Sequence, residues 1–100
     1  MSDIVYTIEN IKDVVAPIAN KYNVESIYLF GSYARGEADE SSDLDFLVFG
    51  GESFKLTNIF ALAEELTTAF QKQVDVFEIS EINDDSDFYL NIMNERLYVA

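Results

Sequence analysis

The sequence predicts an α/β fold, in which short apolar strands alternate with helices along a chain of 100 residues. Three runs, "VESIYLF", "DLDFLVF" and "QVDVFEI", are rich in β-branched and aromatic residues, as buried strands are. Two longer segments carry apolar residues at three- and four-residue spacing, which is typical of amphipathic helices. A chain of this length holds one domain, residues 1–100, and the alternation favours a sheet packed against helices.

The first helix is expected over residues 7–22, where apolar side chains recur at helical spacing. Thr7 is the expected N-cap, and Asn23 the expected end. Pro17 falls inside this segment, so we expect it to remove one backbone hydrogen bond and bend the helix. The first strand follows over residues 24–30.

A short helix of a turn or two is expected over residues 32–35, closed by Gly36 and followed by the polar loop "EADESS". The second strand is expected over residues 43–49, before Gly50 and Gly51.

A second long helix is expected over residues 55–71, and a third strand over 73–79. The helix places one set of apolar residues on one side: Leu56, Ile59, Phe60, Ala63, Leu66 and Phe70. The "NDDSD" cluster is expected to cap a last short helix over residues 88–94. The predicted order is therefore helix, strand, helix, strand, helix, strand, helix.

The chain is strongly acidic, with 19 acidic residues against 6 basic ones and a formal net charge of −13. Such a surface repels nucleic acid, whose binding depends on Lys and Arg at the phosphates, so we expect no direct nucleic-acid contact. The charge either serves solubility alone or attracts a basic protein partner, and clustered carboxylates also attract divalent cations.

Cysteine and histidine are both absent from the sequence. Disulfides, thiolate metal sites and histidine-based catalysis are thereby excluded, which leaves Asp, Glu, Lys and Tyr for any proton transfer. The apolar runs are too short to span a bilayer, and the N-terminus lacks a signal region, so we expect a cytoplasmic protein with no membrane contact.

Two aspartates in the second predicted strand point to a metal site. Asp43 and Asp45 project from the same face of that strand, because side chains alternate. Asp75 is the lone charge within the apolar part of the third strand, and it joins the pair if the two strands are neighbours. Three convergent carboxylates repel one another unless a cation neutralises them, and oxygen ligands suit Mg²⁺ or Mn²⁺.

Gly31 and Ser32 mark a phosphate-binding turn, where the first strand passes into a short helix. Glycine permits close approach to the backbone, the serine hydroxyl adds a donor, and Arg35 brings a positive charge one turn later. Each half also has an ordinary explanation: Ser32 as a helix cap, Arg35 as a surface charge and the aspartates as solvated strand ends. Together, a phosphate cradle and a carboxylate cluster match the needs of a nucleoside triphosphate with bound metal.

The pattern Gly31–Ser32, ten residues, Asp43–Leu44–Asp45 resembles the G-S-x10-D-x-D signature of the DNA polymerase β-like nucleotidyltransferases. The longer string "LFGSYARGEADESSDLDFLV" is similar to the minimal nucleotidyltransferases (MNT), which are the antitoxins of HEPN–MNT toxin–antitoxin pairs. The resemblance implies a mixed sheet flanked by helices. It also implies Mg²⁺ on Asp43, Asp45 and Asp75 as the catalytic carboxylates, and nucleotide phosphates on Gly31, Ser32 and Arg35.

The resemblance further implies a function: transfer of AMP from ATP to a tyrosine of a cognate HEPN ribonuclease toxin, which neutralises the toxin. After the third strand the chain offers only a short helix, so the acceptor is expected on another protein, within a heteromeric complex. Two alternatives stay open. The chain is an antitoxin that masks the toxin by binding alone, or a nucleotidyltransferase that modifies a small molecule with a helper subunit.

Overall fold

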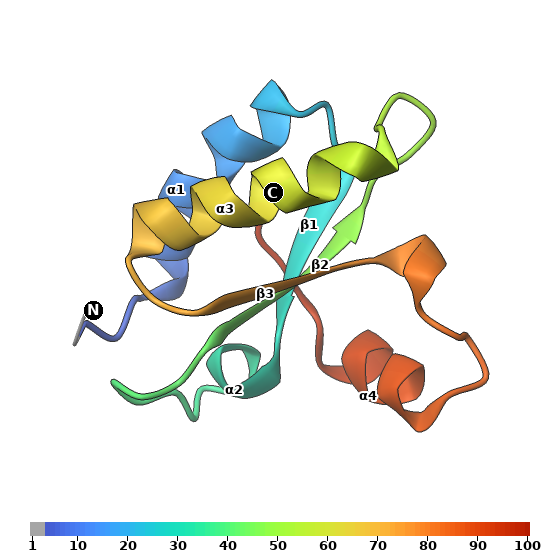
Figure 1. The fold of residues 1–100 in the computed structure, drawn as a ribbon. Coiled ribbons are helices and arrows are strands. Elements are labelled where there is room, and N and C mark those ends of the chain that lie inside the picture. The colour runs from blue at the N-terminus through green and yellow to red at the C-terminus, as the bar shows by residue number, and fades with distance from the viewer. Residues whose placement is uncertain (1–3) are drawn as a thin grey trace.

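Residues 4–100 are described by a computed structural model, in which four strands form one mixed sheet in the order β3-β2-β1-β4 (Figure 1). The strands are β1 (Ser26–Phe30), β2 (Leu44–Phe49), β3 (Val74–Glu78) and β4 (Leu97–Tyr98). β1 is antiparallel to both β2 and β4, whereas β2 runs parallel to β3. The predicted α/β class, with a mixed sheet flanked by helices, is confirmed.

The edge strand β4 contains only two residues, which is too short to show the alternating pattern by which a strand is predicted from sequence. Backbone hydrogen bonds of Val99 and Ala100, the two residues that follow β4, hold this segment on the sheet. The Ile27 N–H donates to the Ala100 carbonyl at 2.7 Å, and the Val99 N–H donates to the Ile27 carbonyl at 3.0 Å. The C-terminal segment therefore extends the sheet beside β1, where the sequence predicts no strand.

Two helices cover one face of the sheet, and two others lie on the opposite side (Figure 1). The first pair is α1 (Ile8–Lys21) and α3 (Ile59–Phe70), and the second is α2 (Gly31–Ala34) and α4 (Asp87–Glu95). Two 3₁₀ helices complete the described chain, η1 (Leu56–Asn58) and η2 (Ile79–Glu81). No helix within residues 4–100 is long and apolar enough to cross a bilayer.

The predicted starts of α1 and α4 are close to the observed ones, whereas α3 begins at Ile59, four residues after the predicted start at 55 and behind η1. Thr7 caps α1, since its hydroxyl accepts the Asn10 N–H at 3.0 Å. Ser86, from the predicted capping cluster, does the same for α4 and accepts the Tyr89 N–H at 3.1 Å. Pro17 lies inside α1, which continues to Lys21.

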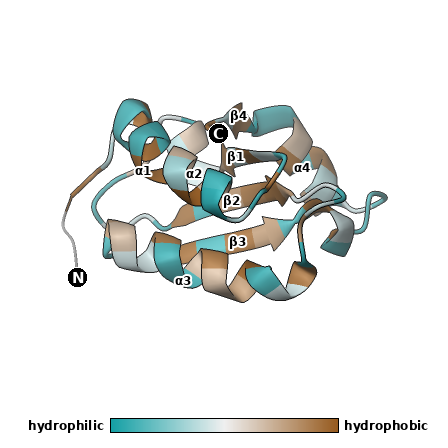
Figure 2. Cartoon of the chain, turned by 90° about the horizontal axis from the view of Figure 1, so that it is seen from above, coloured by the Kyte–Doolittle hydropathy of each residue, from teal (hydrophilic) through white to brown (hydrophobic). Residues whose placement is uncertain are grey.

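The larger core lies between the sheet and the α1–α3 pair, and it takes alternate residues from the strands. The strands are coloured mainly as hydrophobic segments (Figure 2). Its fully buried side chains include Ile11, Val15, Ile27, Leu29, Leu44, Phe46, Val48, Leu62, Leu66 and Phe70. A smaller core of Phe30, Leu47 and Ile92 lies on the α4 side. Because side chains alternate along β2, Asp45 shares the α4 side with Leu47.

The buried side of α3 differs from the predicted one. Phe60 is 80% exposed and Leu56 is 54% exposed, although both were expected on the apolar side of this helix. The buried side runs through Ile59, Leu62, Leu66 and Phe70. Phe60 follows Ile59 by one residue, which turns its side chain about 100° away from that line.

Glu78, at the end of β3, is a buried carboxylate with a structural explanation. It is 4% exposed, and it accepts the Gly50 N–H at 3.0 Å and the Ser80 N–H at 2.8 Å. Burial acts to raise the pKa of Glu78, but these hydrogen bonds and one from the Ser80 hydroxyl hold the pKa below its ordinary value. Glu78 therefore ties the ends of β2 and β3 together as an ionised group.

Candidate active site

The sheet register brings the two halves of the sequence pattern together. Phe30 of β1 pairs with Asp45 of β2, and Asp45 pairs with Asp75 of β3. Gly31 follows Phe30 directly and begins α2. The end of β1 and the first residues of β2 and β3 therefore meet at one edge of the sheet, with the glycine turn beside the carboxylates.

Asp45 is the centre of this group. Its pKa is raised to about 6, first by burial and then by the negative charges of Asp75 and Asp43. A hydrogen bond with Asp75 acts in the same direction, and only the Arg35 charge opposes them. Asp45 and Asp75 thus form a close carboxylate pair, in which the ionised form of Asp45 is unfavourable without a cation.

Asp43 is less closely placed. β2 begins at Leu44, one residue later than predicted, so Asp43 lies just before the strand and is exposed. Its charge still reaches Asp45. Within residues 4–100, however, no three acidic, histidine or cysteine side chains are arranged so that they could hold a metal ion. The structure therefore brings Asp45 and Asp75 together, with Asp43 at the margin of the pair.

Gly31 lies against the Asp45 carboxylate and adopts a left-handed backbone, with φ +75°. A Cβ atom at this position would lie 2.4 Å from Asp45 Oδ2. Both the backbone conformation and the close contact require glycine here. α2 starts at this glycine and not, as predicted, at Ser32, which is half-buried in its first turn.

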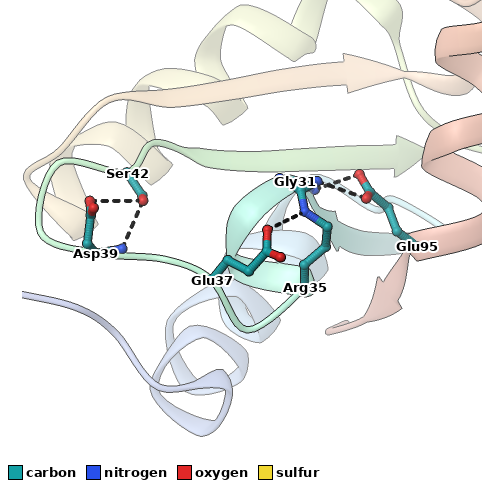
Figure 3. Close-up of polar contacts among 6 residues, drawn as sticks. All are labelled: Gly31, Arg35, Glu37, Asp39, Ser42 and Glu95. Atoms are coloured by element: carbon teal, nitrogen blue, oxygen red, sulfur yellow. Dashed lines mark hydrogen bonds and ion pairs between the residues drawn. The ribbon is translucent and has the colours of Figure 1, made fainter.

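Arg35 is held by two carboxylates at the end of α2 (Figure 3). Its Nε donates to Glu37 Oε1 at 2.9 Å, and its second contact is a 2.9 Å ion pair with Glu95 Oε2. The other oxygen of Glu95 accepts the Gly31 N–H at 3.0 Å. Glu95 therefore belongs to the site although it lies at the end of α4, far along the sequence, where no local pattern distinguishes it.

Two cavities adjoin the candidate site. One has a volume of about 440 Å³ between α2 and α4, and its lining residues are Phe30, Gly31, Arg35, Phe88, Asn91, Ile92, Asn94 and Glu95. The other, of about 560 Å³, lies between the loop before β2 and the end of α3, and Asp43 and Lys72 contribute to its wall. Cavities of this size accommodate small molecules.

The chain matches a known protein family over most of its length. Residues 9–99 match the family "Polymerase beta, Nucleotidyltransferase". The chain belongs to this nucleotidyltransferase family. The resemblance inferred from the sequence is confirmed, and so is the assignment as an enzyme of this class.

Individual relatives give the same result. The Thermococcus cleftensis protein adenylyltransferase MntA is 32% identical over 97 residues, which cover 93% of this chain and 96% of the relative. A Methanocaldococcus jannaschii protein, named as a candidate protein adenylyltransferase, is 41% identical over 76% of this chain and 82% of its own length.

Solved structures show the same fold. One is a Shewanella oneidensis MNT antitoxin in complex with a tri-AMPylated HEPN toxin. It superposes with a TM-score of 0.71 at 17% identity, over 94% of this chain and 72% of that one. The fold that this chain shares with the solved structure is the one that brings its own Gly31, Asp45 and Asp75 together.

Proposed function

We propose that this nucleotidyltransferase is an antitoxin that transfers AMP from ATP to a tyrosine of a cognate HEPN toxin and thereby neutralises it. The observation that carries the proposal is the paired Asp45 and Asp75, in register on neighbouring strands beside the Gly31 turn. The names of the relatives, which are protein adenylyltransferases, support protein as the acceptor. The match over residues 9–99 supports one minimal nucleotidyltransferase domain over residues 1–100.

Asp43, Asp45 and Asp75 are the groups proposed to hold Mg²⁺ or Mn²⁺. Their oxygen donors suit these ions, and the raised pKa of Asp45 reflects burial and then crowded negative charge, which a cation relieves. Mg²⁺ is usually bound by one or two carboxylates plus substrate phosphates, so a preformed three-carboxylate cage is not required. A bound divalent cation supplies charge neutralisation for the phosphates and lowers the pKa of the attacking hydroxyl.

Side chains and backbone groups of the protein bind the nucleotide and accept the proton. The backbone of Gly31, the Ser32 hydroxyl and the Arg35 guanidinium bind and orient the triphosphate. One of the paired carboxylates accepts the proton of the tyrosine hydroxyl. The tyrosine oxygen then forms a bond to the α-phosphorus, the bond from that phosphorus to the bridging oxygen breaks, and pyrophosphate leaves.

The acidic surface favours a basic partner. A net charge of −13 attracts a positively charged protein and repels nucleic acid. A ribonuclease that binds RNA through basic residues fits this description. An ATP-dependent reaction and the lack of cysteines support a cytoplasmic location.

The Asp43→Asn, Asp45→Asn double variant distinguishes AMP transfer from the alternative that the antitoxin only masks the toxin by binding it. We expect the rate of toxin inactivation with ATP and Mg²⁺ to fall by about 100-fold or more, because positioned charge is lost from the transition state. The measurement is the residual ribonuclease activity of the toxin over time. The matched control is Asp84→Asn, Asp85→Asn, which removes two charges from an exposed turn away from the site.

The control should neutralise the toxin like the wild type. If the Asp43→Asn, Asp45→Asn variant also neutralises the toxin fully, the antitoxin acts by binding, and the transfer mechanism is wrong.

A further inference from the structure

The Glu95 carboxylate contacts the two groups of the candidate site that suit an anion, the Gly31 N–H and the Arg35 guanidinium. One carboxylate oxygen accepts the Gly31 N–H at 3.0 Å, and the other pairs with Arg35 at 2.9 Å (Figure 3). Within residues 4–100, no other carboxylate accepts hydrogen bonds from both groups. A single side chain therefore bridges the turn after β1 and the cation at the end of α2.

The position of Glu95 within its own helix makes this contact informative. Glu95 is the last residue of α4, where the helix dipole is negative and disfavours a carboxylate. Its attractive partners come instead from another element, 60 or more residues away in the chain. The carboxylate is thus held by the site and not by its helix.

Gly31 and Arg35 are also two of the groups proposed above to bind the nucleotide phosphates. Both line the cavity between α2 and α4, and Glu95 forms part of the same wall. A phosphate cannot accept the Gly31 N–H while the Glu95 carboxylate does, because one N–H makes one strong hydrogen bond.

We propose that Glu95 is an internal substitute for a nucleotide phosphate, which the triphosphate must displace before it binds. The inference rests on the proposed function, because it concerns the same site. Glu95 then sets the affinity for nucleotide and keeps Arg35 and the glycine turn ordered when no nucleotide is bound.

The ion pair between Glu95 and Arg35 is accessible enough for a bound phosphate to replace the Glu95 carboxylate. The side chain of Glu95 is 22% exposed and that of Arg35 is 45% exposed. Arg35 also keeps a second carboxylate partner, Glu37, which is itself exposed. A triphosphate carries more negative charge than one carboxylate, and it can use the Ser32 hydroxyl as well.

Nucleotide affinity of the Glu95→Gln variant tests this. Glutamine keeps the size of the side chain but loses the charge that competes with phosphate. We expect Mg²⁺-ATP to bind about tenfold more tightly, the change that corresponds to one weakened charge-assisted hydrogen bond. Binding of adenosine, which has no phosphate, should be unchanged. Isothermal titration calorimetry measures both dissociation constants.

The matched control is Glu64→Gln, which removes the same charge from the exposed surface of α3. Inorganic tripolyphosphate serves as a third ligand, because its binding does not depend on AMP transfer. Thermal unfolding of each variant shows that the fold is retained.

An ATP affinity of Glu95→Gln equal to that of Glu64→Gln would overturn the inference. Weaker ATP binding would also overturn it, because Glu95 would then orient Arg35 for the phosphate. Absence of binding of any phosphate ligand has the same consequence. If no variant transfers AMP but Glu95→Gln still binds tripolyphosphate more tightly than the control, the proposed function falls and the inference about Glu95 stands.

Discussion

Replacing Asp45 by asparagine is expected to stabilise the protein at neutral pH while it abolishes AMP transfer. The Asp45 carboxylate is half-buried beside Asp75 and Asp43, so its ionised form is unfavourable in the folded state. Asparagine has nearly the same shape without the charge. A gain in stability together with a loss of activity is the behaviour expected of a strained functional residue and not of a structural one.

The pH dependence of this effect has a defined sign. The pKa of Asp45 is raised to about 6 in the folded protein, from an ordinary value of 3.8. The protonated form of Asp45 therefore favours folding. Its contribution to stability is fully present below pH 3.8 and is lost as the pH rises through about 6.

Thermal unfolding at pH 8 and at pH 4 measures the effect of Asp45→Asn. Because Asp45 is half exposed, solvent screening reduces the expected gain at pH 8 to about 1 kcal/mol, or about 4–8 °C in Tm. Asp85→Asn, on an exposed turn, is the charge-matched control. A gain of the same size at both pH values, or none at pH 8, would contradict the electrostatic explanation.

Replacing Gly31 by alanine is expected to be the most destabilising single change at the site. The left-handed backbone at φ +75° disfavours alanine, and the new Cβ would lie 2.4 Å from Asp45 Oδ2. We expect the free energy of unfolding to fall by about 2–4 kcal/mol from these two effects together. Urea denaturation measures it.

Gly36 provides a control with the same backbone conformation. Its φ is +74°, and a Cβ there would meet nothing within 4 Å. Gly36→Ala should therefore cost only the backbone term, about 1 kcal/mol. Combining Gly31→Ala with Asp45→Ala should recover part of the loss, since the clashing oxygen is removed. Equal effects of the two glycine substitutions would show that the contact with Asp45 is unimportant.

Much of the fold could be predicted from the sequence because its elements carry local signals. Thr7, Ser86 and the glycines after the strands mark element ends within one or two residues. β4 could not be predicted, because its two residues are placed by pairing with Tyr28 and Leu29 of β1 and not by a local signal. The exposure of Phe60 depends on which side of α3 packs on the sheet, because Phe60 is turned about 100° from the buried line through Ile59 and Leu62.

Some residues of the candidate site could also be predicted from the sequence, and others could not. The pattern of Gly31, Ser32, Asp43 and Asp45 is local and can be found by spacing alone. Asp45 and Asp75 lie side by side because β2 pairs in parallel with β3. The sequence does not establish this pairing, so it predicts that the two aspartates are close only if the strands are neighbours. Glu95 reaches the site from α4 through tertiary structure, so no sequence pattern indicates it.

AMP transfer is tested by the intact mass of the cognate toxin after incubation with this protein, ATP and Mg²⁺. We expect the toxin to gain the mass of one or more AMP units, and this gain to disappear with Asp45→Asn. A toxin that is bound and silenced at its original mass would contradict transfer, and the antitoxin would act by masking alone.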